Sequence, residues 1–206
     1  MSPPSVSIKV TANLSNMKAL LREIVKCTVC AKFLPHGPRP VLAASAQSRI
    51  VIIGQAPGRK VHESGVPWRD QSGDTLRAWL GVDAEAFYDA AKFALVPMGF
   101  CYPGTGKTGD LPPRPECAPL WHERLMAGMK NVQLVILIGQ YSQARYLGDK
   151  AGDTLTETVR RHREFLSRFL PLPHPSPRNR IWLRRNPWFE TEVVPELRTR
   201  VARILR

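Results

Sequence analysis

The stretch IVIIGQAPGRKVHESGVPWRDQSGD, residues 50–74, decides the fold of this chain. It opens with an unbroken β-branched run, Ile50–Ile53, which suits a strand covered on both faces in a parallel sheet, although periodicity alone leaves a helix open. The next five residues, GQAPG, contain two glycines and a proline and predict a tight turn. Open α/β sheets bind ligands at the carboxyl ends of their strands. The turn is therefore either a ligand-binding loop or an ordinary strand-to-helix connection.

Composition indicates a globular protein with a polyanionic partner. The chain has 206 residues, 43% of them hydrophobic, which is enough for one domain with a sizeable core. We therefore expect a single domain over residues 1–206, with residues 1–13 as a loose lead-in. Lys and Arg number 30 and Asp and Glu 17, which gives a net charge of +13. Such an excess points to nucleic acid, the alternative being a merely basic soluble protein.

The sequence also indicates a cytoplasmic protein. No apolar run approaches the length of a membrane span, and the opening MSPPSVSIKV lacks the hydrophobic core of a signal peptide. Cysteines in the cytoplasm seldom form disulfides, so the four cysteines of this chain call for another explanation.

Helical and strand patterns alternate along the rest of the chain. A first amphipathic helix is expected from Ser15, a second from near Asp74 to Gly81, and a short one after Asp83. Further strands are expected at 93–98, 132–138 and 169–172, and further helices at 120–129, from 140 to 147, and at 190–206. This alternation predicts an α/β fold, a three-layer α/β/α arrangement with a central, mainly parallel four-stranded sheet.

Residues 154–165 have two interpretations. Thr154 and Glu157 form a capping box, which favours a helix. Threonines at 154, 156 and 158 alternate with other residues, which suits an extended arm equally well. The sequence leaves this choice open.

The four cysteines are spaced as metal ligands. Cys27 and Cys30 form a CxxC, and Cys101 and Cys117 each lie beside a proline-rich turn. Four thiolates suit either zinc or an iron–sulfur cluster. A redox CxxC is the rival interpretation, but such pairs usually follow a strand and a helix precedes this one. A third interpretation is that the four cysteines are unrelated structural residues.

Three motifs and the cysteine set together resemble the uracil-DNA glycosylase superfamily, and most closely its iron–sulfur (family-four) branch. GQAPG at 54–58 resembles that branch's GEAPG or GEGPG turn, and GVPW at 65–68 resembles its GxPF. HPSPRN at 174–179 resembles the superfamily's second motif, in a form close to the single-strand-selective glycosylases. The resemblance covers nearly the whole chain, from Leu20 to Leu205, with the motifs in family order.

The resemblance implies an activity, a cofactor and a partner. The activity is that of a DNA glycosylase that flips uracil or a related deaminated base out of DNA and hydrolyses its N-glycosidic bond in base-excision repair. The cofactor is a [4Fe–4S] cluster, with zinc as the alternative, and its implied ligands are Cys27, Cys30, Cys101 and Cys117. The partner is single- or double-stranded DNA, and no obligate protein partner is evident.

Site residues follow from the same resemblance. Trp68 takes the position of the aromatic that stacks on the extruded base, and His174 that of the histidine that donates to the oxygen of the leaving base. Gln55 is expected to hydrogen-bond the base or water, and His62 to handle water or stabilise the charge on the sugar. The implied catalytic residues are His174, Gln55 and His62, and the implied base- and DNA-binding residues are Gly54, Ala56, Pro57, Gly58, Trp68, Ser176, Arg178 and Asn179.

A basic segment follows the second motif. Its arginines and apolar residues alternate in the order Arg180, Ile181, Trp182, Leu183, Arg184, Arg185 and Trp188. This mixture suits contact with phosphates plus an apolar wedge between bases. A basic solvated helix is the alternative.

Two departures from the family pattern bear on the activity. Ala56 stands where other branches have Asp or Asn, so no side chain there orients water. Pro97 stands where the family has its uracil-reading asparagine, and proline offers neither a side-chain donor nor a backbone N–H. The excised base therefore stays open, and so does a protein that binds nucleic acid without the chemistry. A glycosidase for free nucleosides is a third possibility, and it predicts little salt-sensitive affinity for DNA.

Overall fold

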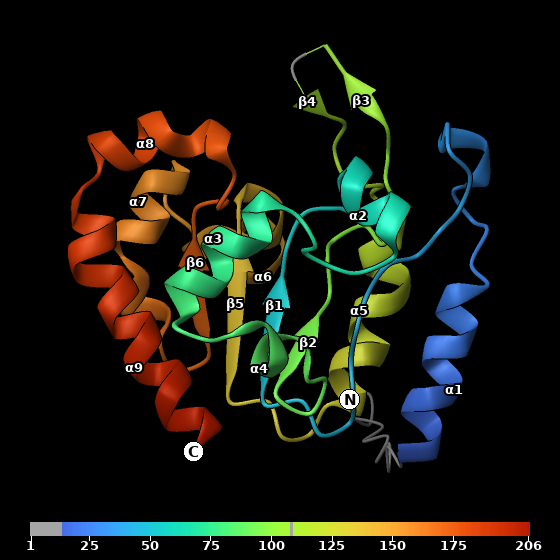
Figure 1. Ribbon diagram of the computed structural model, residues 1–206, viewed down its shortest axis with the longest axis horizontal. Helices are drawn as coiled ribbons and strands as arrows, with labels where there is room; N and C mark the ends of the chain where they lie inside the picture. Colours follow the sequence, from blue (N-terminus) through green and yellow to red (C-terminus); the bar gives the residue numbers. More distant parts are fainter. Residues whose placement is uncertain (1–13, 108) are drawn as a thin grey trace, which may run out of the picture.

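The computed structural model describes residues 14–107 and 109–206, and its centre is a parallel four-stranded sheet (Figure 1). The expected fold class is confirmed. Across the sheet the strands are β2 (Phe93–Leu95), β1 (Ile50–Ile53), β5 (Leu134–Ile138) and β6 (Phe169–Leu172), and every pairing is parallel. The expected lead-in, residues 1–13, lies outside the described part of the chain.

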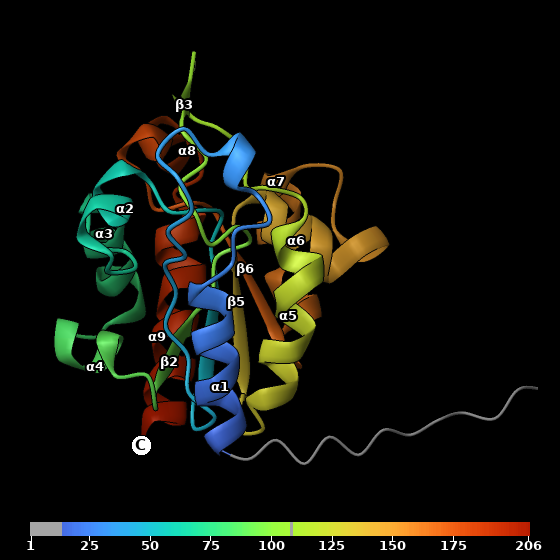
Figure 2. The ribbon, with the colours of Figure 1, turned by 90° about the vertical axis from the view of Figure 1, so that its right-hand side faces the viewer.

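Alternate side chains of each strand enter two different hydrophobic cores. In β1, Ile50 and Ile52 belong to one core, and Val51 and Ile53 to the other. The helices α3 (Gln71–Leu80), α4 (Ala84–Tyr88) and α9 (Val194–Leu205) cover the first face of the sheet, and α1 (Leu14–Val25), α5 (Cys117–Gly128) and α6 (Gln140–Leu147) cover the second (Figure 2). Because all four residues of β1 are fully buried, the β-branched run is explained by burial on both faces.

Several expected elements have different bounds. The helix expected near Asp74 begins at Gln71, because the carboxylate of Asp70 caps it by accepting a hydrogen bond from the Gly73 amide at 2.9 Å. The strand expected over 93–98 ends at Leu95. Beyond it the chain still follows β1, although Pro97 contributes no amide to that contact.

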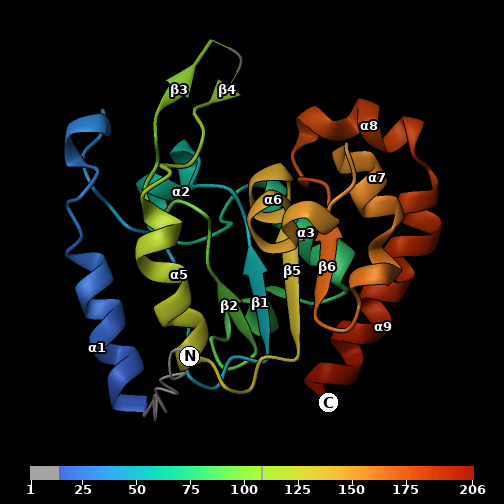
Figure 3. The ribbon, with the colours of Figure 1, turned by 180° about the vertical axis from the view of Figure 1, so that it is seen from behind.

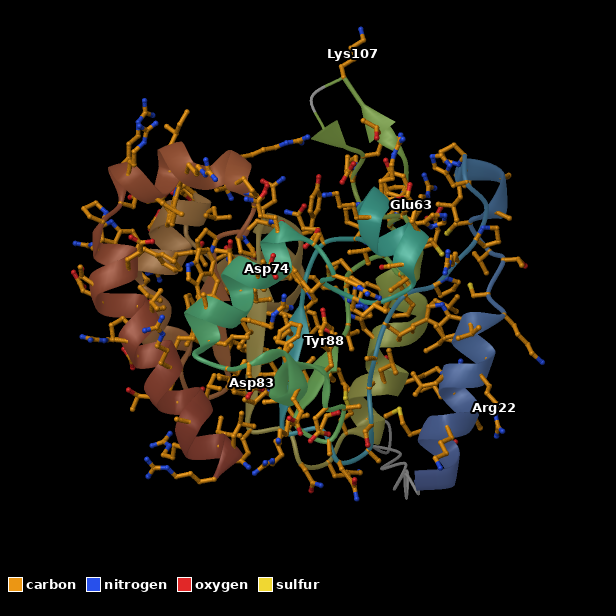
Figure 4. The ribbon with its side chains drawn as sticks, in the orientation of Figure 1. Arg22, Glu63, Asp74, Asp83, Tyr88 and Lys107 are labelled. Atoms are coloured by element: carbon orange, nitrogen blue, oxygen red, sulfur yellow. The ribbon has the colours of Figure 1, made fainter. Side chains whose placement is uncertain are left out.

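Two elements were not expected from the sequence. The helix α2 (Arg59–Ser64) lies inside the predicted glycine-rich loop and ends at Gly65, whose φ is +69°. The two-residue strands β3 (Thr105–Gly106) and β4 (Gly109–Asp110) form an antiparallel hairpin in the loop after Cys101. This hairpin projects beyond the carboxyl ends of the parallel strands and carries Lys107 at its tip (Figure 4).

Residues 154–165 are helical, which settles the choice that the sequence left open. The helix α7 (Leu155–Arg160) begins after Thr154, whose hydroxyl accepts a hydrogen bond from the Glu157 amide at 3.1 Å. Four short 3₁₀ helices connect the described elements: η1 (Ala31–Phe33), η2 (Gly148–Lys150), η3 (His162–Phe165) and η4 (Pro177–Asn179). The α-helix α8 (Arg180–Arg185) follows η4, and the π-helix η5 (Phe189–Val193) leads into α9. None of the described helices combines the length and apolar character needed to span a bilayer.

Candidate active site at the carboxyl end of the sheet

A cavity of about 450 Å³ is lined by the turn after β1, the loop after β6 and the β3–β4 hairpin. Figure 3 shows this hairpin beyond the carboxyl-end edge of the sheet. Most of the cavity's lining comes from the turn after β1, the segment from Pro67 to Ser72, the residue Pro97, the hairpin and the loop after β6. Val41, and Val61 of α2, complete it. The expected site residues that line it are Gly54, Gln55, Ala56, Pro57, Gly58, Trp68, His174, Ser176, Arg178 and Asn179. The fold thus brings the first and second motifs to one place.

Two glycines allow Trp68 to reach the cavity. Its indole lies against Gly54 so closely that a Cβ there would come within 2.8 Å of a ring carbon. Its carbonyl lies against Gly73, where an added Cβ would collide with it. Trp68 itself has a φ of 58°, in the left-handed region that side chains other than glycine rarely adopt. The indole position is therefore fixed by its own backbone and by close packing on both sides.

His174 faces the same cavity from the loop after β6. Its ring centroid lies 5.7 Å from that of Trp68, and the two planes are tilted by 31°. The side-chain amide of Asn179 donates to the His174 carbonyl at 2.7 Å, which holds the loop in shape. Burial lowers the pKa of His174 to about 4, against the opposing effect of Asp70. Near neutral pH the imidazole is uncharged and has one N–H to donate.

Pro97 forms an apolar part of the wall. Its carbonyl points away from the cavity and accepts a hydrogen bond from Nε2 of His122 at 3.0 Å. Nδ1 of His122 then accepts from the Tyr146 hydroxyl at 2.8 Å. The amides of Val96 and Met98 donate to the backbone of β1 and to Gly54. The amides of this wall are thus engaged, and it offers a base no backbone hydrogen-bond donor.

Asp70 is a cavity residue that the sequence analysis missed. It lines the cavity from the N-terminus of α3 and lies close enough to His174 to oppose the fall of its pKa. Its sequence position does indicate one property: an Asp just before a helix is a typical N-cap residue. That pattern predicts a cap and says nothing of a cavity. Ser72 and Asp110 also line the cavity and were likewise not expected.

His62 is not brought to this cavity. It lies on α2, whose residue Val61 lines the first cavity, whereas His62 lines a second one with His36 and Tyr102. Successive residues of a helix point about 100° apart, so one helix presents these neighbours to different sides. The expected catalytic role of His62 has no support in this placement.

The four cysteines converge on a small cavity of their own, about 20 Å³ in volume. Cys27 and Cys30 follow α1, Cys101 follows β2, and Cys117 is the first residue of α5. All four are unpaired and half-buried. Cys117 accepts a hydrogen bond from the Phe100 amide at 3.3 Å. Burial raises the pKa of Cys101 to about 11 and that of Cys117 to about 12.

The four thiols are ligands of the right kind for a metal centre, and they line one cavity. They are not already arranged as a cage around an ion. Within residues 14–107 and 109–206, no three His, Cys, Asp or Glu side chains are grouped closely enough to hold one ion. Four sulfur donors around one cavity are nevertheless the donor set of an iron–sulfur cluster or of structural zinc.

The basic segment after the second motif is the helix α8, whose apolar residues divide between core and surface. Trp182 packs against the first core and donates from Nε1 to the Thr156 hydroxyl at 2.8 Å. Ile181 is 55% exposed. Just before α8, the guanidinium of Arg178 lies against Gly109 of the hairpin, where an added Cβ would collide with it. Arg178 and the hairpin thus meet at the cavity.

A comparison with known protein families gives a match over most of these elements. The model of the uracil DNA glycosylase superfamily matches residues 42–198, which is more than half of the chain. The matched range contains every residue that lines the first cavity except Val41. It begins after Cys27 and Cys30, so it does not extend to the CxxC.

Proposed function

Because the chain belongs to the uracil DNA glycosylase superfamily, we propose that it excises uracil or a related deaminated base from DNA by hydrolysing the N-glycosidic bond. The observation that carries this proposal is that Trp68, His174 and the turn at 54–58 line one cavity. A volume of about 450 Å³ lies in the range of pockets that enclose small molecules. A base extruded from DNA needs such a pocket.

Trp68 is the stacking platform for the extruded base. Its indole lines the cavity, and stacking of a base on an aromatic ring contributes about 1–3 kcal/mol. Gln55 lines the cavity beside it, with its side-chain amide against Gly139 at the end of β5. The amide of Gln55 is therefore the polar group at the end of the sheet that hydrogen-bonds the base.

His174 stabilises the charge that develops on the leaving base. As the glycosidic bond breaks, the bonding electrons pass to the base and its carbonyl oxygen becomes more negative. The imidazole is neutral at physiological pH, because burial holds its pKa near 4. It therefore acts by donating its N–H to that oxygen. No proton has to leave His174 for this effect.

Asp70 supplies the negative charge that the sugar requires. The deoxyribose develops oxocarbenium character in the transition state, which a nearby carboxylate stabilises. Oδ1 of Asp70 accepts from the Gly73 amide, which fixes the carboxylate at the cavity wall. We assign to its second oxygen the task of orienting the attacking water. Asp70 would thereby take a role for which Ala56 has no suitable side chain, and it lines the cavity, which His62 does not.

DNA would lie across the end of the molecule that carries the hairpin, the 176–179 loop and α8. The arginines of α8 are exposed and contact phosphates, and the exposed Ile181 is the apolar side chain that enters the base stack. Trp182 is anchored in the core and supports the helix.

We also propose a [4Fe–4S] cluster with a structural role, held by Cys27, Cys30, Cys101 and Cys117. When bound, it supplies a cross-link between the end of α1, the segment after β2, and the start of α5. The amide of Phe100 is already positioned to donate to the sulfur of Cys117.

A panel of oligonucleotides tests the activity. Single- and double-stranded DNA carrying uracil, hypoxanthine, xanthine or hydroxymethyluracil is incubated with excess cluster-replete protein, and abasic sites are counted over time. We expect product with at least one base, and a rate lower by about 10²–10³ for His174→Ala, because one donor to the leaving oxygen is lost. The melting temperature of His174→Ala should differ little from that of the wild-type protein, so that the lower rate does not reflect unfolding. Absence of product from every substrate would exclude the enzyme.

The second candidate function is binding of nucleic acid without excision. It is favoured by Pro97, because the wall that faces the base has no donor with which to select it. It predicts that the wild-type protein binds the same oligonucleotides without forming abasic sites. His174→Ala would then leave affinity unchanged.

A further inference from the structure

A second cavity, of about 420 Å³, lies against α2 and is lined mainly by cationic and aromatic side chains. The residues around it are His36, Arg39, Arg59, His62, Glu63 and Tyr102. None of them lines the first cavity. The two cavities are nevertheless neighbours, because Gly58 and Val61 face one while Arg59 and His62 face the other.

Three rings form the floor of this second cavity. His36 stacks on Tyr102 with 5.4 Å between ring centroids and 19° between planes. His62 is tilted against both rings at 5.8 Å. Tyr102 is fully buried, and its hydroxyl hydrogen-bonds to that of Thr105. The floor is therefore held in place by the core beneath it.

The cavity carries positive charge, and one of its lining residues has an unpartnered ring nitrogen. Nδ1 of His62 is buried and has no hydrogen-bond partner among the described residues. Burial lowers the pKa of His62, and the positive charge of Arg39 and the ring of His36 lower it further. Arg59 forms no ion pair or hydrogen bond within the described part of the chain. Glu63 is the one carboxylate among the lining residues.

Arg39 has a structural task that separates it from Arg59. Its Nη1 donates to the carbonyl of Glu63 at 3.1 Å, and its guanidinium lies against Gly65, so it caps the end of α2. Arg59 stands at the start of α2 and is exposed. A cation there gains nothing from the helix dipole, so folding does not explain this arginine.

From this arrangement we propose that the second cavity binds a phosphodiester group of the DNA strand whose nucleotide enters the first cavity. The proposal rests on the proposed glycosylase function. The guanidinium of Arg59 and the imidazole of His62 are groups that can donate hydrogen bonds to phosphate oxygens. With only α2 between the cavities, one strand can occupy both, and anchoring the phosphate holds the extruded nucleotide in register.

Arg59→Gln tests the proposal, with Lys60→Gln as the matched control. The two residues are adjacent and exposed in the first turn of α2, and each substitution removes one positive charge. Lys60 lines neither cavity. Affinity for an oligonucleotide with a stable abasic-site analogue is measured by fluorescence anisotropy between about 50 and 200 mM salt.

We expect Arg59→Gln to reduce the slope of log K against log salt by about 0.7–0.9, the value for one lost phosphate contact. Arg59→Lys should restore the slope, and Lys60→Gln should leave it unchanged. His62→Ala should weaken binding without changing the slope, because it removes the imidazole, a neutral donor.

Three results would overturn the proposal. Equal slope losses for Arg59→Gln and Lys60→Gln would mean that only diffuse charge attracts DNA. Unchanged slopes in both would mean that no phosphate is bound there. Competition by inorganic phosphate that Arg59→Gln abolishes, with an unchanged DNA slope, would identify a site for free anions. A wild-type protein without salt-sensitive DNA binding would instead count against the proposed function itself.

Discussion

At the scale of single residues, His122 and His174 are both kept neutral by their surroundings, with pKa values of about 4. The ordinary value for histidine is 6.5, so the unfolded chain binds protons between pH 6.5 and 4 that the folded chain does not. Stability should therefore be complete above pH 6.5 and fall as the pH approaches 4. For His122, which is 2% exposed, the loss is on the order of 3 kcal/mol.

Urea unfolding at a series of pH values between 4 and 7.5 checks this pH dependence. His122→Gln should be less stable at pH 7, because a flexible amide replaces the buried ring that bridges the Pro97 carbonyl and the Tyr146 hydroxyl, but its stability should depend less on pH. An unaltered pH dependence in His122→Gln would show that other groups cause it.

Gly54 is expected to control the stacking platform. A methyl group there would stand 2.8 Å from a ring carbon of Trp68, so Gly54→Ala must displace the indole. We expect affinity for base-containing DNA to fall about 10-fold or more, which is the scale of one lost stacking contact. Trp68→Phe provides the control, because a smaller ring leaves room for the methyl group. The double variant should lose less than the sum of the two single losses, and strict additivity would contradict the steric explanation.

At the scale of elements, the strands were predictable from sequence because their residues are buried on both faces. Ile50–Ile53 has no polar residue, and a short β-branched run of that kind favours a strand that is buried on both faces. The helix α2 was not predictable, because RKVHES has a single buried apolar residue and no repeat. Without α2, the sequence could not predict which cavity His62 lines. The turn of that helix directs Val61 to the first cavity and His62 to the second.

In the candidate site, too, some residues were predictable from the sequence and others were not. Trp68 and His174 were identified through their motifs, and the structure places both at one cavity. The contact of the Trp68 carbonyl with Gly73 could not be predicted from the sequence. It accompanies a left-handed backbone conformation at Trp68, which tryptophan rarely adopts. Asp70 was overlooked because its carboxylate is both a helix cap and a cavity wall, and a sequence pattern shows only the first.

The proposed cluster also belongs to the scale of elements, since its cysteines come from three separate segments. We expect anaerobically purified protein to be brown and to contain iron and acid-labile sulfide in equal amounts. Cys117→Ser should lose most of the iron, and amide hydrogen exchange in α1 should rise, because α1 and α5 would lose their shared cross-link. Stoichiometric zinc without iron would contradict the iron–sulfur assignment while retaining the four ligands.

At the scale of the whole molecule, the two cores lie on opposite faces of one sheet and share every strand. Neither core can lose its strands without exposing the other. Arg49 adds a connection between distant parts of the chain: its guanidinium donates to the carbonyls of Ile204 at 2.6 Å and Leu205 at 3.3 Å. The residue before β1 thus holds the end of α9. This interdependence is the physical basis for the prediction of a single domain.

Denaturation of the intact protein tests that prediction. Far-ultraviolet circular dichroism and tryptophan fluorescence should give coincident transitions, because Trp79 reports on the first core and Trp121 on the second. Arg49→Gln should shift both transitions together to lower denaturant, by about 1–3 kcal/mol for hydrogen bonds made by a charged group. Thr199→Ser, a mild change on the exposed side of α9, serves as the control and should shift neither. If Arg49→Gln instead separated the transitions, α9 and its face of the sheet would unfold independently, and the chain would not behave as one domain.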